Sequence, residues 1–425
     1  MGFELFIARR LKLGSNGSKG SPSLNVALIG VALAIAVMIL SIVIVMGFKS
    51  EISSKIYALD PHIKVTNAAV GIDNNIATVD SRDVFAPIMA DSAFKSQISS
   101  MSLTADKPAI LKTDSDFKGI VYRGVDDGFD WSYIKSHLTG GRLPRIASDG
   151  RLPRIASDAL NEVVISKTIA NQLGLKVGDK ILTYFIDSKV KVRNSHIVGI
   201  FNTDFDHFDK QVMMGNIALI QQVNGWNSYV GNYVGIDMAN TGTVREESYS
   251  LFKTLALWTY EKGGDTLYNV TNTQDNNKSF FIWLGMLNMN VAIILILMMV
   301  VSGFTLVSAL LMIVLERIRL VGLLKAMGAT NGSVRRIFIY LTQKLIIKAL
   351  IAGNAVGLGL ALLQQNFHIV RLNPEAYYMP YVPIEINATS LVALNVAIVV
   401  ISYITLLGPS YIVSSIKPTS TMKFE

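Results

Sequence analysis

The sequence lacks cysteine altogether, has only five histidines among its 425 residues, and contains only 16% charged residues. Without cysteine, disulfides and thiolate metal sites are excluded. The histidines are scattered and form no HExxH pair, and no GxSxG nucleophile motif is present. The stretch GSNGSKGSPS does not have the spacing of a phosphate-binding GxxxxGK[ST] loop. We therefore predict that the chain is not an enzyme and that it binds no cofactor or metal directly.

The few charges are unevenly distributed. Residues 49–278 hold 25 basic and 26 acidic residues, so the net charge of +8 lies entirely in the more apolar ends of the chain. A nucleic-acid-binding surface would need basic residues gathered on a soluble face, and the soluble part of this sequence has no such excess. We therefore expect no nucleic-acid partner. The low charge content and the positive mean hydropathy indicate a membrane protein.

Four uncharged stretches are longer than the roughly 20 residues that a helix needs to cross a membrane. They are Gly20–Phe48, Ser279–Leu315, Ala349–Val370 and Ile386–Ile416. The apolar run of the first is too long for a cleaved signal peptide and is followed by no small-residue cleavage site, so we expect an uncleaved signal anchor. The second would be about 55 Å long as a helix, and it should therefore begin as a stalk outside the bilayer.

Lysine and arginine near the helix ends predict the orientation. Four basic residues precede the first span, five follow the second and two lie in the C-terminal tail, whereas the loop between the third and fourth spans has only Arg371. Both termini should therefore be cytoplasmic and residues 49–278 should lie outside. In a bacterium this corresponds to a multi-pass inner-membrane protein with a periplasmic domain.

The outer block has the pattern of a mixed domain. NEVVISKTIANQLGLKVGDKILTYFI reads as strand, helix, turn and strand, and VREESYSLFKTLALW reads as an amphipathic helix. We therefore predict an α-helical membrane protein with four transmembrane helices and a large α+β extracytoplasmic domain inserted between helices 1 and 2. The expected parts are an amphipathic N-terminal helix and linker (1–23), the first span (24–47), the periplasmic domain with stalk helices (48–278), a stalk and the second span (279–315), a cytoplasmic loop (316–337), the third span (338–364), a short periplasmic loop (365–388), the fourth span (389–415) and a tail (416–425).

Two features of the outer block have competing interpretations. RLPRIASD occurs at Arg142–Asp149 and again at Arg151–Asp158, and its proline indicates loop. An in-frame duplication or an artefact explains it better than a functional repeat. The cluster Asp204, Asp206, His207 and Asp209 lacks the glycine turn and closing glutamate of a calcium loop, so a solvated loop is favoured over a metal site.

The loop after the second span contains a short amphipathic helix. In ERIRLVGLLKAMGAT, helical spacing places four apolar residues in one arc of about 100°, with Lys325 opposite and Gly328 at the end. The four residues are Leu320, Leu323, Leu324 and Met327. This pattern suits either a helix lying on the inner membrane surface or one that docks onto a cytoplasmic partner.

The same stretch, which begins with Glu316 and Arg317, resembles the cytoplasmic motif of FtsX-like (MacB-type) ABC transporter permeases. VMGFKSEISSKIYALDPHI after the first span, FIARRL near the start and KPTSTMKFE at the end are similar to the lipoprotein-releasing (Lol-type, LolC/LolE) subgroup. The resemblance covers essentially the whole chain. It implies a mechanotransmitting permease that releases lipoproteins from the inner membrane and moves them toward the outer membrane.

The resemblance also implies partners. A separate LolD-like ATPase subunit would hold ATP and Mg²⁺ and dock on the coupling helix, for which Glu316, Arg317, Leu320, Leu323, Leu324, Lys325 and Met327 are the candidate residues. A second permease copy or paralogue would complete the membrane part, and a periplasmic carrier would receive the lipoprotein. For an acylated cargo, we expect a cavity between the first two spans, although plain helix packing would also explain the candidates Ile42, Val45, Met46, Ile282, Met286 and Met289.

The sequence departs from the family in two places. Members that recruit a carrier have an extended hook between two outer strands, and YFIDSKVKVRNSHIV leaves room only for a tight hairpin. The motif continues as RLVG, without the acidic residue common before its Val-Gly pair. An FtsX-like permease for peptide or drug export or for control of a cell-wall hydrolase therefore remains an alternative, as does a sensor that binds a ligand with its outer domain.

Overall fold

The computed structural model describes residues 6–7, 22–68, 78–114, 116–146, 157–186, 189–263 and 266–411. The chain divides into two compact units. A membrane unit comprises residues 1–51, 282–371 and 381–425, and an outer unit comprises residues 52–281 and 372–380. Most of the predicted N-terminal amphipathic helix, the second RLPRIASD copy up to Ala156 and the C-terminal tail lie outside the described residues.

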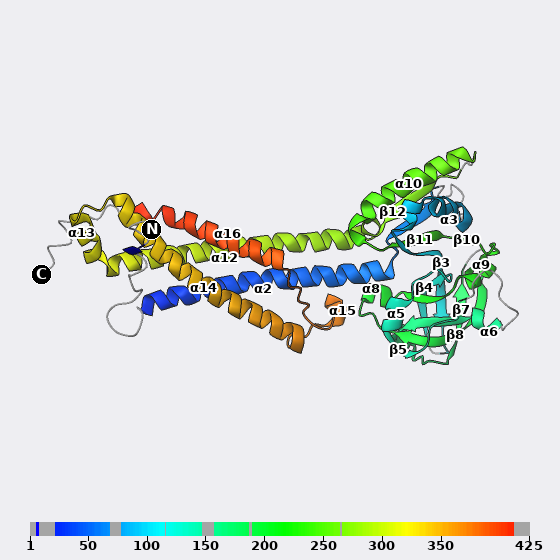
Figure 1. Ribbon diagram of the computed structural model, residues 1–425. Helices are drawn as coiled ribbons and strands as arrows, with labels where there is room; N and C mark the ends of the chain where they lie inside the picture. The colour runs from blue at the N-terminus through cyan, green and yellow to red at the C-terminus, as the bar shows by residue number, and fades with distance from the viewer. Residues whose placement is uncertain are drawn as a thin grey trace. The chain divides into compact units, whose positions relative to one another are not determined.

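Four helices are long and apolar enough to cross a membrane (Figure 1). They are α2 (Pro22–Leu59), α12 (Lys278–Glu316), α14 (Asn331–Phe367) and α16 (Ala388–Leu407). α14 starts before residue 338, the predicted start of the third span, because hydropathy detects only the apolar part of a helix. Its true beginning is a cap, in which the Thr330 Oγ1 accepts a hydrogen bond of 3.2 Å from the Ser333 N–H.

Small and amide side chains hold the helices of the membrane unit together. A Cβ on Gly353 of α14 would lie 2.7 Å from both the Ala32 carbonyl oxygen and the Ile35 Cβ of α2, so this close approach requires glycine. Asn354 and Asn395 exchange hydrogen bonds between α14 and α16, at 2.7 and 3.1 Å. Two amides that satisfy each other in this way avoid the cost of leaving a polar group unpaired in hydrocarbon.

The outer unit is built on a mixed sheet in the order β12-β1-β11-β3-β4-β9-β6-β8-β5, with β7 pairing with both β3 and β8 and with a separate β2–β10 pair. Most neighbours are antiparallel, while β4–β9 and β6–β8 are parallel. The strands are β1 (Ile63–Asn67), β2 (Val79–Asp80), β3 (Ile98–Lys112), β4 (Phe117–Val125), β5 (Leu138–Gly141), β6 (Glu162–Ser166), β7 (Lys180–Phe185), β8 (Lys191–Phe201), β9 (Val212–Asn216), β10 (Val230–Gly231), β11 (Tyr233–Met238) and β12 (Tyr268–Asn272).

Helices accompany this sheet. They are α3 (Ser81–Ala90), α4 (Ser92–Lys95), α5 (Ser132–Ser136), α6 (Ser157–Leu160), α7 (Lys167–Leu173), α8 (Asp206–Asp209), α9 (Ile217–Asn224), α10 (Val244–Glu261), α11 (Thr273–Asn276) and α15 (Pro374–Tyr377). Local sequence explains the boundaries: Ser166, the last residue of the fully buried strand β6, accepts a hydrogen bond from the Ile169 N–H and so starts α7. Gly174 at φ +65° ends α7. The predicted mixed domain between the first and second membrane helices is therefore confirmed.

Candidate functional site

The cytoplasmic-loop candidates lie on a short helix between two sharp changes of direction. α12 ends at Glu316, and Arg317 leaves the helical region with φ −117° and ψ 23°. The helix α13 then runs over Ile318–Ala326. Gly328 follows at φ +93°, a conformation that favours glycine, and α14 begins three residues later. The chain thus makes a compact helical connection between two membrane helices.

Packing divides the predicted apolar arc of α13 into two faces. Leu324 is only 2% exposed and, together with Val321, belongs to the core cluster of the membrane unit, which Leu320 also contacts. Leu323 and Met327 are 52% and 67% exposed, and Arg319 and Ala326 lie on the same outward side. Sequence reasoning overlooked the buried Val321. The sequence did contain an indication of this burial: Val321 and Leu324 are three residues apart, which places both on one helix face.

The outward face of α13, which we call the α13 ridge, consists of Arg319, Leu323, Ala326 and Met327. It is apolar in the middle and cationic at its N-terminal end. Leu323 and Met327 are four residues apart, so they form one continuous apolar surface. Exposed apolar side chains that are not needed for the fold are typical of docking surfaces. The other coupling candidates, Glu316, Arg317 and Lys325, are exposed or half-buried.

The candidate cargo residues differ in exposure between the two helices. On α2, Ile42, Val45 and Met46 are half-buried, whereas Ile282, Met286 and Met289 on α12 are exposed by 54 to 69%. The helices meet elsewhere: the Lys49 ammonium donates to Asn288 Oδ1 at 3.1 Å, and the rings of Phe48 and Trp283 lie 5.7 Å apart. The three α12 candidates are thus exposed in the single chain, although Met286 lies only about 60° around the helix from Trp283.

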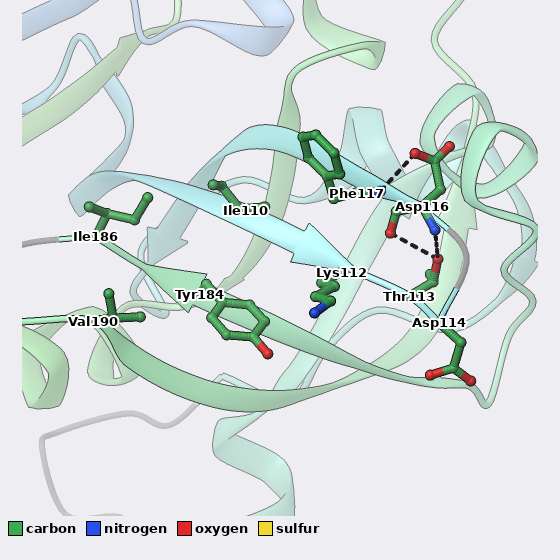
Figure 2. A pocket seen from close by; sticks show the side chains of 9 residues that line it. All are labelled: Ile110, Lys112, Thr113, Asp114, Asp116, Phe117, Tyr184, Ile186 and Val190. Carbon is green, nitrogen blue, oxygen red and sulfur yellow. Dashed lines mark hydrogen bonds between the residues drawn. The ribbon is translucent and has the colours of Figure 1, made fainter.

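The β7–β8 hairpin corresponds to the stretch YFIDSKVKVRNSHIV, for which the sequence predicts a tight hairpin instead of an extended hook. The two strands are joined by residues 186–190 only. Next to the hairpin is a cavity of about 480 Å³. Figure 2 shows the side chains that line it, which come from β3, from β4 and from the hairpin and include Ile110, Tyr184 and Ile186. Phe117, Ile186 and Val190 are 70%, 58% and 62% exposed. Ile186 and Val190, on the two sides of this connection, are thus exposed apolar side chains.

The acidic cluster of residues 204–209 serves the fold. Asp209 is 1% exposed and accepts hydrogen bonds from the Thr203 N–H at 3.1 Å and from the Thr203 hydroxyl at 2.8 Å. Burial, and to a smaller extent the neighbouring Asp204 and Asp206, raise the pKa of Asp209 to about 6, although the hydrogen bonds from Thr203 act to lower it. Among the described residues, no three His, Cys, Asp or Glu side chains are grouped so that they could hold a metal ion.

Comparison with known proteins adds independent information. The model of the FtsX-like permease C-terminal region matches residues 292–418, and that of the MacB-like periplasmic core domain matches residues 26–246. Two curated relatives, both lipoprotein-releasing system transmembrane proteins LolC, are similar over nearly their full length. The protein from Xylella fastidiosa (strain 9a5c) is 20% identical over 421 residues, which is 94% of this chain and 93% of the relative. The protein from Neisseria meningitidis serogroup B is 20% identical over 422 residues, which is 94% of each chain.

A solved structure of the periplasmic region of MacB from Actinobacillus actinomycetemcomitans is also similar, with 12% identity and a TM-score of 0.34, covering 53% of this chain and 95% of that one. The two family models together cover the first apolar helix, most of the outer unit and the three remaining membrane helices. The chain therefore belongs to the FtsX-like permease family of ABC transporters, whose members span the membrane and work with an ATPase partner, and it carries a MacB-like periplasmic core domain.

Proposed function

We propose that the chain is the permease subunit of an ABC transporter that releases lipoproteins from the bacterial inner membrane, with ATP hydrolysed by a separate subunit. The similarity to the two LolC proteins supports this proposal, because it extends over 94% of this chain and at least 93% of theirs. A resemblance limited to the membrane helices or to the outer domain would not distinguish lipoprotein release from other tasks of the family. Both termini and α13 would be cytoplasmic, and the outer unit would be periplasmic.

The α13 ridge supports the part of the proposal that assigns ATP hydrolysis to a separate subunit. The chain has no GxxxxGK[ST] motif of its own, so a partner must supply the energy of ATP hydrolysis. Leu323 and Met327 offer that partner an apolar contact, and Arg319 beside them offers a charged one. A cleft of the ATPase that closes on nucleotide binding would then move α13, and with it the membrane helices α12 and α14 that α13 connects.

The cargo would be lifted from the outer leaflet along α2 and α12. The exposed methionines Met286 and Met289 can adapt to acyl chains of varied shape. Since these side chains are exposed in the single chain, we infer that the acyl chains lie between two permease copies or paralogues. The exposed apolar side chains of Ile186 and Val190 on the β7–β8 hairpin form the surface that we assign to a periplasmic carrier.

The decisive experiment identifies what copurifies with the permease and its ATPase. Photo-crosslinking residues at Met46 and Met289 should capture a triacylated protein, and addition of ATP should release it. Crosslinkers at the exposed apolar positions Val392 and Ile404 of α16 provide controls for random contact with lipid-anchored proteins. Capture of a peptide or a drug-like compound, or equal capture at the control positions, would refute lipoprotein release.

A further inference from the structure

The outer unit contains a second cavity, of about 670 Å³, that the transport proposal does not use. This volume lies within the range of small-molecule binding sites, about 300–1,000 Å³. The lining comes from α3, from β3, from the turn after β4, from α9 and from the segment between α9 and β10. We call this cavity the α3–α9 cavity.

Its position in the sheet is typical of a binding site. β4 and β9 are parallel neighbours, with Val125 opposite Asn216, so their carboxyl ends meet at one edge. Asp126 follows β4 directly, and α9 begins directly after β9. In open α/β sheets, ligands bind beyond the carboxyl ends of parallel strands. Gly124 permits the close approach, since a Cβ there would lie only 2.7 Å from the Ile217 Cα.

One side of the α3–α9 cavity is apolar and aromatic. Phe85 and Met89 contribute from α3, Leu103 from β3, and Trp226 and Tyr229 from the segment after α9. Met89 and Tyr229 are each 49% exposed, so this wall reaches the surface. Aromatic faces of this kind attract both apolar groups and cations.

The acidic side chains that line the cavity are not neutralised by basic ones. Arg82, the cation in the lining, is already paired with Asp80 at 3.0 Å and 2.7 Å, and it lies 4.5 Å from the centre of the Tyr229 ring. Asp126 accepts hydrogen bonds from the backbone N–H groups of Leu103, at 2.9 Å, and Gly128, at 3.1 Å. Within the described part of the chain, neither Asp126 nor Asp127 has a cationic partner. The polar end of the cavity is therefore negative.

A buried amide in the lining also lacks a partner. Asn216 is 2% exposed, and its Oδ1 accepts a hydrogen bond of 2.9 Å from the Ala218 N–H at the start of α9. Its Nδ2 is buried without a hydrogen-bond acceptor. Leaving such a donor unpaired is energetically unfavourable.

We propose that the α3–α9 cavity binds cationic amphiphiles, that is, small molecules with an apolar ring or chain and a protonated amine. The amine would lie at Asp126 and Asp127, and the apolar part would pack against Phe85, Trp226 and Tyr229. This site is separate from the cargo path and from the α13 ridge, and the inference holds whether or not the transported substrate is a lipoprotein. The outer unit would thereby detect an extracytoplasmic amine.

The test is calorimetric titration of the full chain in nanodiscs with three probes of one shape. These are 3-(1-naphthyloxy)propan-1-amine, the corresponding propan-1-ol and the carboxylate 4-(1-naphthyloxy)butanoate. We expect the amine to bind saturably at one site per chain, and the alcohol and the carboxylate to bind at least tenfold more weakly. Equal affinity for the three probes, or an absence of saturable binding of the amine, would overturn the proposal.

Variants assign the binding to the cavity. Asp126→Asn with Asp127→Asn should remove the preference for the amine, while Asp83→Asn, an exposed α3 carboxylate outside the lining, should keep it. Partition of the probe into the membrane is the same for all variants. A difference in amine affinity between variants therefore reports binding at the cavity. If the double variant unfolds, Asp127→Asn alone changes an exposed side chain and should still weaken amine binding several-fold. Unchanged amine preference in a folded variant would refute the assignment.

Discussion

The ammonium of Lys55, near the end of α2, donates a hydrogen bond of 2.9 Å to the backbone carbonyl of Tyr378, a residue 323 positions later in the chain. A second bond, of 2.8 Å, goes to the Thr203 carbonyl. Lys55 is 5% exposed, and the Tyr378 ring packs against Phe205 and Phe280 at 5.3 and 6.2 Å. These contacts hold residues 372–380, which follow α14 in the chain, within the outer unit, of which they form part.

The Lys55 contact predicts a stability effect. Lys55→Met keeps the apolar stem and removes the ammonium, which leaves two buried carbonyls without their donor. We expect a loss of about 1–3 kcal/mol in the free energy of unfolding of the outer unit. Denaturant unfolding of the full chain, followed by tryptophan fluorescence, would measure it. Lys95→Met, at an exposed lysine of the same unit, is the matched control and should change little. An unchanged midpoint in Lys55→Met would show that the contact contributes no stability.

Asp209 should make the outer unit more stable in mild acid than at neutral pH. Burial raises its pKa to about 6, above the unfolded value of about 3.9. Protonation therefore favours the folded state, and this contribution is complete below about pH 4 and is lost as the pH rises through 6. Asp209→Asn should remove this component, worth about 2 kcal/mol. Denaturation midpoints from pH 4 to 8 would show it as a difference between wild type and variant. Parallel curves for the two proteins would contradict the prediction.

Glu162 should act in the opposite direction. Burial alone would raise its pKa, but hydrogen bonds from Arg142 at 2.9 Å and Arg145 at 3.0 Å outweigh burial and lower the pKa to about 2. The stabilisation is thus present above about pH 4.3 and is lost as the pH falls through 2. Because both arginines are more than half exposed, we expect Glu162→Gln to cost only about 1–2 kcal/mol at pH 7.

The measurement for Glu162 is again the denaturation midpoint, now at pH 7 and at pH 3. The difference between wild type and Glu162→Gln should be largest at pH 7 and should shrink at pH 3. Glu261→Gln, at an exposed acidic residue, is the control. A cost of Glu162→Gln that is the same at both pH values would mean that the two arginines do not act through the carboxylate charge.

The sequence was sufficient to predict those features that depend on local pattern. Hydropathy located α2, α12, α14 and α16, because a membrane helix must present apolar side chains over its whole length. The apolar, β-branched run VVIS located β6, and the helical spacing of TIANQLGL located α7 in the outer unit. The start of α14 was missed because its first turns are polar and contain Arg335 and Arg336, so that hydropathy has no signal there.

Contacts between distant parts of the chain could not be predicted. Nothing near Lys55 in the sequence indicates that its ammonium meets carbonyls 148 and 323 residues away. Helical spacing predicted which apolar residues of α13 lie close together around the helix. It could not predict which of these residues other helices bury. In the structure, Leu324 is buried in the core of the membrane unit and Leu323 is exposed. The α3–α9 cavity likewise joins Arg82 with Tyr229, which only the fold brings together.

The last prediction concerns Leu323, which stands in the middle of the α13 ridge. Because its side chain is 52% exposed, Leu323→Asp should leave the fold and membrane insertion intact. In a docked ATPase groove the new carboxylate would lose water without gaining a partner, which costs several kcal/mol. We therefore expect the ATPase to stop copurifying, or to hydrolyse ATP without transport. Leu267→Asp, at a 70% exposed leucine of the outer unit, is the matched control and should retain both activities. If α13 only rests on the membrane surface, the carboxylate would loosen the helix from lipid while the ATPase remained bound. Normal copurification together with normal transport in Leu323→Asp would therefore rule out the α13 ridge as the coupling surface.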